Sequence, residues 1–158
     1  MKFLFSLFAL MLVVKECDSN KKEQLNDEVK ASSKIEQMDN LIINYTMQSR
    51  GMYEAVTITN ETIKVSGRDE SNSKASALPE AEWQRLQQLV SQLNLEKLSQ
   101  LKAPTDKRLY DGAPMATLKL ERDGKSIETP TFDHGHPPAM IEDLVNKVLS
   151  LKETATKD

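Results

Sequence analysis

The residues most able to do chemistry in this chain gather in one loop at positions 132–138. The loop contains both histidines of the sequence, His134 and His136, and one carboxylate, Asp133. Imidazole and carboxylate groups are ligands that zinc and other first-row metals accept. An extended backbone would point both histidines to the same side, and a carboxylate beside an imidazole can fix its tautomer for acid–base catalysis. One interpretation is therefore a metal-dependent or histidine-dependent hydrolytic site.

The same loop also has the composition of a structural turn. Gly135 and the two prolines at 137 and 138 are typical turn residues, and Asp133 could accept hydrogen bonds from backbone amides. We favour this interpretation, and we expect no catalytic residue, no bound metal and no cofactor. The hydrolytic enzyme remains as the alternative.

A second polar loop spans residues 105–114, directly before the clearest hairpin of the sequence. The turn of this hairpin is Asp123-Gly124, a type I′ pair between two segments of alternating apolar residues. In a hairpin the start of one strand lies beside the end of its partner, so both loops should meet at the same end. We therefore expect a composite binding surface or, as the favoured alternative, a clasp of loop-end ion pairs. The residues of either would be Arg108, Tyr110, Asp111, Asp133, His134 and His136.

Composition excludes several other classes. The chain of 158 residues has a net charge of −3 without a basic cluster, which argues against a nucleic-acid partner. A single cysteine allows no internal disulfide. The nucleotide-binding glycine patterns and the HExxH and GxSxG motifs are absent from the sequence.

The first 19 residues are typical of a signal peptide. Residues 3–14 are uncharged and too few for a bilayer-spanning helix, which needs about 20. Cys17 follows this run, as the acylated cysteine of a bacterial lipoprotein does, although Lys15 and Glu16 depart from the small residues preferred there. Ordinary cleavage near Ser19 is the alternative. Either way we expect an exported protein, outer-membrane or periplasmic, lipid-anchored through Cys17 or soluble.

The rest of the chain divides by composition. Residues 20–39 are rich in Lys, Glu, Gln, Asn, Ser and Asp, and they predict a flexible tether because they bury too little apolar surface to offset ordering entropy. Residues 40–151 are predicted to form the folded domain, and residues 152–158 a disordered tail.

Within the domain, apolar periodicity changes between two and 3.6 residues. The order β-β-β-α-β-β-α predicts a two-layer α+β fold, a five-stranded, mainly antiparallel sheet covered by two amphipathic helices. Residues 68–77 are predicted to be a polar loop. The strands are expected at 41–47, 53–59, 62–67, 116–122 and 125–129, and the helices at 79–93 and 139–151.

Several short patterns carry a resemblance. They are Ser49-Arg50-Gly51, Glu82-Trp83, Ala103-Pro104-Thr105, Asp111-Gly112-Ala113 and the loop from Phe132 to Pro138. Together they resemble a family of uncharacterised exported lipoproteins of Bacteroidetes-type Gram-negative bacteria. The resemblance implies export and assigns no activity or site residue. The order of elements is also similar to that of emfourin-type protease-inhibitor domains.

These observations predict a monomeric, non-enzymatic binding domain of the cell envelope. Its partner would be an envelope protein or a small ligand, and a membrane if Cys17 is acylated. Two alternatives stay open: the hydrolytic enzyme centred on residues 133–136, and an inhibitor of an exported protease.

Overall fold

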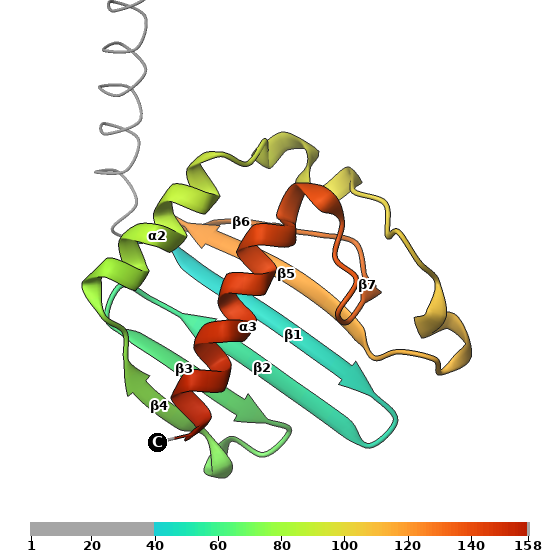
Figure 1. The fold of residues 1–158 in the computed structure, drawn as a ribbon, viewed down its shortest axis with the longest axis horizontal. Helices are drawn as coiled ribbons and strands as arrows, with labels where there is room; N and C mark the ends of the chain where they lie inside the picture. The colour runs from blue at the N-terminus through green and yellow to red at the C-terminus, as the bar shows by residue number, and fades with distance from the viewer. Residues whose placement is uncertain (1–39, 158) are drawn as a thin grey trace, which may run out of the picture.

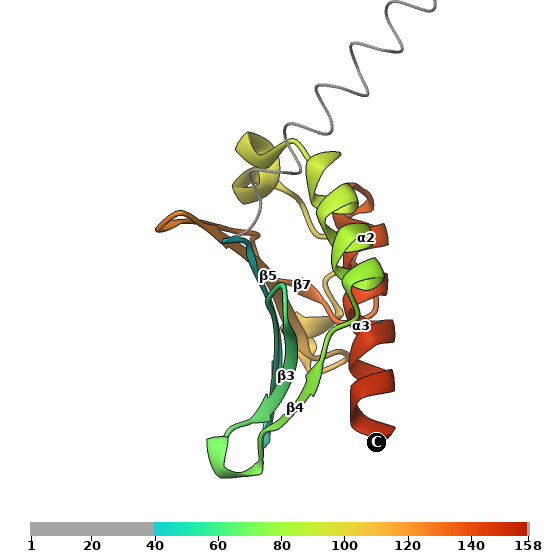
Figure 2. The ribbon, with the colours of Figure 1, turned by 90° about the vertical axis from the view of Figure 1, so that its left-hand side faces the viewer.

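Strand β1 (Ile42–Ser49) is the centre of the fold, with β2 (Met52–Ile58) along one side and β5 (Met115–Arg122) along the other. The computed structural model describes residues 40–157, and all strand pairs within that range are antiparallel. Both α-helices cover one face of the sheet and leave the other open (Figure 1; Figure 2). The α+β class, with an antiparallel sheet and two covering helices, is therefore confirmed.

Alternation along the strands decides which face meets the helices. Ile43, Tyr45 and Met47 on β1 are buried, while the residues between them are half-buried on the open face. Tyr45 lies opposite Val56 on one neighbour and Leu118 on the other, so the three central strands form one apolar floor. The remaining strands are β3 (Thr62–Gly67), β4 (Lys74–Ala77), β6 (Lys125–Glu128) and β7 (Phe132–Asp133), in the order β4-β3-β2-β1-β5-β6, with β7 also paired to β5.

The prediction of five strands is wrong, because the sheet has seven. The additional β4 lies within the segment predicted to be a polar loop, and its four residues carry no apolar alternation. Pairing with β3 and hydrogen bonds from the Lys74 and Ser76 side chains to carbonyls of the last helix hold it in place. The other addition, β7, is only two residues long and follows Pro130. Both strands depend on tertiary partners that local sequence does not reveal.

The helices are amphipathic, as predicted. They are α2 (Glu80–Ser91) and α3 (Glu142–Lys157), with short 3-10 helices η1 (Glu70–Asn72), η2 (Leu95–Gln100), η3 (Lys107–Tyr110) and η4 (Ala139–Ile141). Trp83 on α2 is 3% exposed and belongs to the single hydrophobic core beneath both helices. An ion pair between Lys147 and Glu82 joins the two helices.

The predicted disordered tail from residue 152 is instead helical as far as Lys157. Ala155 is 7% exposed, so this last turn packs on the domain. The side chain of Lys152 also reaches Glu54 on β2, with 2.6 Å between Nζ and Oε1. These contacts hold residues 152–157 in helical form, although their polar composition is typical of a disordered chain end.

The predictions for the first 39 residues, namely the signal peptide, the acylated Cys17 and the tether, lie outside the described residues. Within residues 40–157, none of the helices combines the length and the apolar character needed to cross a bilayer.

Two regions of the surface lie at opposite ends of β1. At one end the chain enters at residue 40 beside the β5–β6 turn, where Asp123 and Gly124 have φ angles of 53° and 74°, as the predicted type I′ turn requires. At the other end Gly51, with φ of 79°, turns β1 into β2. Eight residues of strand at about 3.4 Å each place these ends about 27 Å apart.

Candidate functional site

A buried carboxylate joins the two polar loops. Asp133 is 0% exposed, and its two oxygens accept four hydrogen bonds. Oδ2 accepts from Thr105 Oγ1 at 2.5 Å and from the Lys107 amide at 2.7 Å. Oδ1 accepts from the amide of Arg108 at 2.9 Å and from its Nη1 at 3.2 Å. We call this arrangement of Thr105, Lys107, Arg108 and Asp133 the Asp133 clasp.

The clasp keeps Asp133 ionised. Burial by itself would raise the pKa of the carboxyl, but the hydrogen bonds from Thr105, Arg108 and Lys107 favour the charged form and outweigh it. The pKa therefore lies well below its usual range. A buried charge is tolerated here because each oxygen has two donors.

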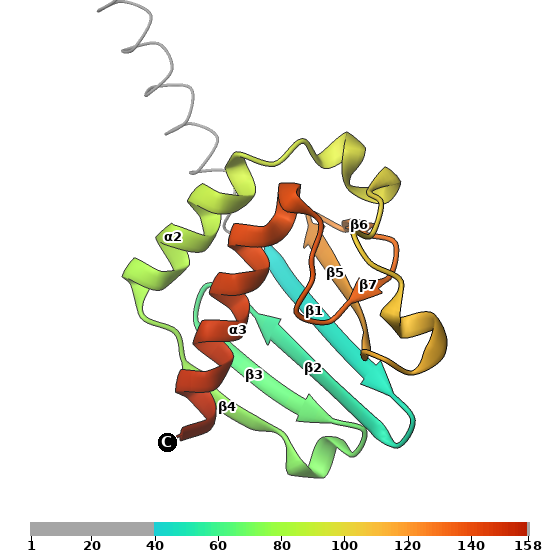
Figure 3. The same ribbon diagram turned by 45° about the vertical axis from the view of Figure 1, so that its right-hand side comes forward.

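Arg108 belongs to the clasp rather than to an open surface. Its side chain is 12% exposed, and Nη1 also contacts the Thr105 carbonyl at 2.7 Å and the Asp106 carboxylate at 3.1 Å. Arg108 therefore pairs with Asp133 of the histidine loop, while Asp111 contacts Arg50. Figure 3 shows η3, which carries Arg108, beside β7, which carries Asp133.

His134 points into the protein. Its Nδ1 lies 2.8 Å from the hydroxyl of Tyr45, a buried residue of β1. Burial, and then the negative charge of Glu54, raise the pKa of Tyr45 far above its usual value, so the hydroxyl keeps its proton. A phenol hydroxyl both donates and accepts, so this bond has two forms: the hydroxyl donates to Nδ1 of the tautomer protonated on Nε2, or it accepts from Nδ1–H of the other tautomer. Burial, with Lys152 as the second cause, lowers the pKa of His134 against the opposing effect of Glu54.

His136 points elsewhere and is exposed. Its Nε2 lies 3.1 Å from Lys107 Nζ. A lysine ammonium can only donate hydrogen bonds, so the imidazole nitrogen accepts this one. The two histidines diverge because Gly135, with φ of 81°, reverses the backbone between them, whereas the prediction of a shared side assumed an extended chain. Among residues 40–157 there is no group of three His, Cys, Asp or Glu side chains placed to hold a metal ion.

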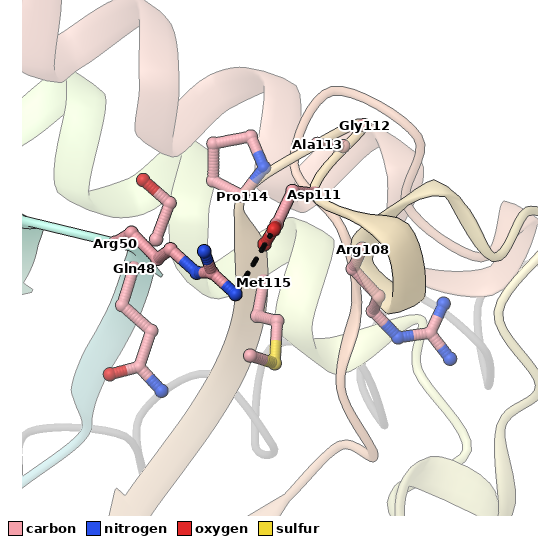
Figure 4. Close-up of a pocket in the computed structure, with 9 residues that line it drawn as sticks. Gln48, Arg50, Arg108, Asp111, Gly112, Ala113, Pro114 and Met115 are labelled. Atoms are coloured by element: carbon pink, nitrogen blue, oxygen red, sulfur yellow. Dashed lines mark ion pairs between the residues drawn. The ribbon is translucent and has the colours of Figure 1, made fainter.

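Asp111 and Tyr110 lie outside the clasp. Asp111 ends η3 in the left-handed conformation with φ of 58°, and its carboxylate is 3.5 Å from the guanidinium of Arg50 on the β1–β2 turn. Both side chains are well exposed, so this ion pair contributes little. It crosses a hollow of about 660 Å³ whose walls include Gln48, Arg50, Arg108, Pro114 and Met115 (Figure 4).

The tip of η3 presents two large apolar side chains to solvent. Leu109 is 73% exposed and Tyr110 71%. Behind them the backbone is tight: a Cβ on Gly112 would lie 3.1 Å from the Tyr110 ring and 3.2 Å from the Lys107 carbonyl oxygen. We call Arg50, Leu109, Tyr110 and Asp111 the loop-end surface.

Of the six residues expected to form one surface, the structure therefore makes two groups. Arg108 and Asp133 are bonded in the clasp, next to His134, which bonds to Tyr45, and His136, which bonds to Lys107, while Tyr110 and Asp111 face solvent. The sequence did not identify Thr105 and Lys107 as donors to Asp133, Tyr45 as the partner of His134, or Arg50 and Leu109 as parts of the loop-end surface. A backbone amide or a strand hydroxyl gives no local signal of the distant carboxylate or imidazole that it meets.

Comparisons with protein-family models, with curated proteins and with solved structures found no match.

Proposed function

We propose that this protein is a non-enzymatic binding domain of the cell envelope, and that the loop-end surface is where it contacts its partner. The observation that carries the proposal is the contrast within η3. A fully buried carboxylate holds the base of this short helix, yet Leu109 and Tyr110 at its tip contact solvent.

This contrast favours recognition over a purely structural role. Side chains that remain about 70% exposed add little to the hydrophobic core, so core formation does not account for their presentation. A loop ordered before binding loses less entropy when a partner arrives. Tyr and Arg are also the residue types enriched at interface hot spots.

The position of the surface suits a tethered protein. The chain enters at residue 40, at the opposite end of β1 from Arg50, about 27 Å away. A domain anchored through its N-terminal segment would therefore present the loop-end surface away from the anchor. Export, and either acylation of Cys17 or release after cleavage, are part of this proposal and rest on the sequence of the first 19 residues.

The protease-inhibitor function is a second candidate, favoured by the same rigid and exposed tip. The hydrolytic alternative has less support. Asp133 has all of its acceptor sites engaged, and the two imidazoles bond to different partners. Hydrolysis at this loop would require the clasp to open before a substrate or metal could reach the carboxylate.

The test compares three forms of the immobilised domain in an envelope extract: wild type, L109S/Y110S and the control M140S. Met140 is another exposed apolar residue, 37% exposed, located on η4. We expect the same proteins to be retained by wild type and M140S and lost with L109S/Y110S, while thermal melts show all three folded. Equal retention by all three would contradict the proposal.

A second measurement separates the two candidates. Wild type and L109S/Y110S are titrated into a zinc endopeptidase and a serine endopeptidase, each acting on a peptide substrate. Stoichiometric inhibition by wild type alone would assign the surface to protease inhibition, and no inhibition with retained capture would leave the binding function.

A further inference from the structure

An apolar groove lies at the end of the domain where the chain enters. It has a volume of about 330 Å³, room for about 11 water molecules at about 30 Å³ each. Its apolar lining comes from the start of β1, the end of α2, η2 and the β5–β6 hairpin. We call it the β5–β6 groove, and these lining residues are Leu41, Val90, Leu95, Leu120 and Ile127.

The groove walls are continuous with the hydrophobic core. Leu41, Val90 and Leu120 are 3–4% exposed and belong to the core, and Leu95 and Ile127 are half-buried against it. The apolar surface that remains to be covered therefore belongs mainly to Leu95 and Ile127, and its removal from water is favourable. The groove therefore favours an apolar occupant.

We propose that residues 33–39 of this same chain, the segment that directly precedes the domain, occupy the β5–β6 groove. The segment has the sequence SKIEQMD and offers two large apolar side chains, Ile35 and Met38. They precede Leu41 by six and three residues, so at about 3.6 Å per residue they lie within about 22 and about 11 Å of a residue that lines the groove.

Charge is complementary between the segment and the groove. Ile35 has Lys34 on one side and Glu36 on the other. The groove offers Glu96 from η2 and Arg122, Asp123 and Lys125 from the hairpin, and Arg122 already lies 3.9 Å from the Asp123 carboxylate. Each charge of the segment therefore has an opposite charge available, although exposed pairs of this kind add only a fraction of a kcal/mol each.

Connectivity favours this occupant over any separate partner. Ile35 and Met38 are joined to Leu41 by five and two residues, and so short a connection gives an effective concentration in about the millimolar range. A free partner would have to displace it. Docking also means that the flexible tether ends near residue 32 rather than at residue 39. The docked segment then sets the direction in which the tether leaves the domain.

The experiment uses a chain starting at residue 18, which retains the predicted tether and all of residues 40–157 with their complete core. The test variant is I35S/M38S. The matched control is L25S/V29S, which makes the same kind of change in the same tether farther from the groove. All four positions precede the folded domain, so misfolding is not expected, and the ring signals of Tyr45 and Phe132 check this.

The readouts are the NMR positions of the Val90, Leu95 and Ile127 methyl groups and the Tm. We expect I35S/M38S to move all three methyl signals and to lower Tm by about 3–6 °C, with L25S/V29S like wild type. Unchanged methyl signals and Tm in I35S/M38S would overturn the proposal. Wild-type methyl positions that shift on tenfold dilution would also overturn it, because the occupant would then be a second copy. Neither result bears on the loop-end surface.

Discussion

Replacing Asp133 by asparagine should release the 105–110 loop while the sheet stays folded. The side chains have the same shape, but asparagine keeps one acceptor oxygen and presents an NH₂ group in place of the other. If the NH₂ group replaces Oδ1, both groups of Arg108 face a donor. If it replaces Oδ2, the Lys107 amide faces a donor, whereas the Thr105 hydroxyl can turn and accept.

The size of the effect follows from the bonds that are lost. A hydrogen bond to a charged group contributes about 1.5–3 kcal/mol, so one or two lost bonds cost about 1.5–6 kcal/mol. The η3 loop can detach without opening the central strands, so most of this loss should appear locally. One factor of ten corresponds to about 1.4 kcal/mol, and amide exchange at Lys107 and Arg108 should therefore accelerate by about 10- to 10⁴-fold.

The assay is hydrogen exchange followed by NMR at neutral pH, with D106N as the matched control. Asp106 contacts the same Arg108 Nη1 at 3.1 Å, but its side chain is 69% exposed, so its removal should cost less than about 1 kcal/mol. If the Lys107 and Arg108 amides of D133N exchange at wild-type rates, or if D106N matches D133N, the argument that burial makes the clasp strong is wrong.

A pH series provides an independent check on the same carboxylate. Because its folded-state pKa lies below the unfolded value of about 3.9, its contribution to stability is fully present above that value. The contribution is lost as pH falls through the folded pKa. The difference in unfolding free energy between wild type and D133N should thus stay constant from pH 8 to 5 and shrink below pH 4.

Four further predictions concern the neighbouring side chains. Y45F removes the hydroxyl that bonds to His134 Nδ1, so it should cost about 1 kcal/mol in urea melts; an unchanged unfolding free energy would contradict this. Since the folded pKa of His134 is lowered, its contribution to stability is complete above about pH 6.5 and declines on acidification, so wild type should lose stability between pH 7 and 5 more steeply than H134Q. R50A breaks only an exposed ion pair and should change the unfolding free energy by about 0–1 kcal/mol; a larger loss in thermal melts would show that the Arg50–Asp111 contact is structural. One equivalent of zinc should leave the His134 ring signals unchanged, because residues 40–157 bring no three ligand side chains together and His136 contacts Lys107 instead; a zinc-induced shift that H136A abolishes would restore the metal-site hypothesis.

Local patterns predicted much of the sheet and helix layout. Alternation of apolar residues located β1, β2, β3 and β5, and the Asp123-Gly124 pair located the β5–β6 turn, because a strand that buries one face must alternate and a type I′ turn needs positive φ. The 3.6-residue stripe located α2 and α3 in the same way. Hairpin geometry also predicted that the 105–114 and 132–138 loops would meet.

Which residues of these two loops bond to one another was decided only by the tertiary structure. The sequence shows Asp133 beside two histidines, but the folded carboxylate bonds to amides and side chains 25–28 residues away and holds a loop rather than an imidazole. His134 meets a tyrosine 89 residues away, and side chains of β4 bond to carbonyls in the last turn of α3, about 80 residues farther along the chain. Periodicity records which face of an element is buried. Hydrogen-bond partners far apart in the chain depend on how the faces pack, and that information lies in no single stretch of sequence.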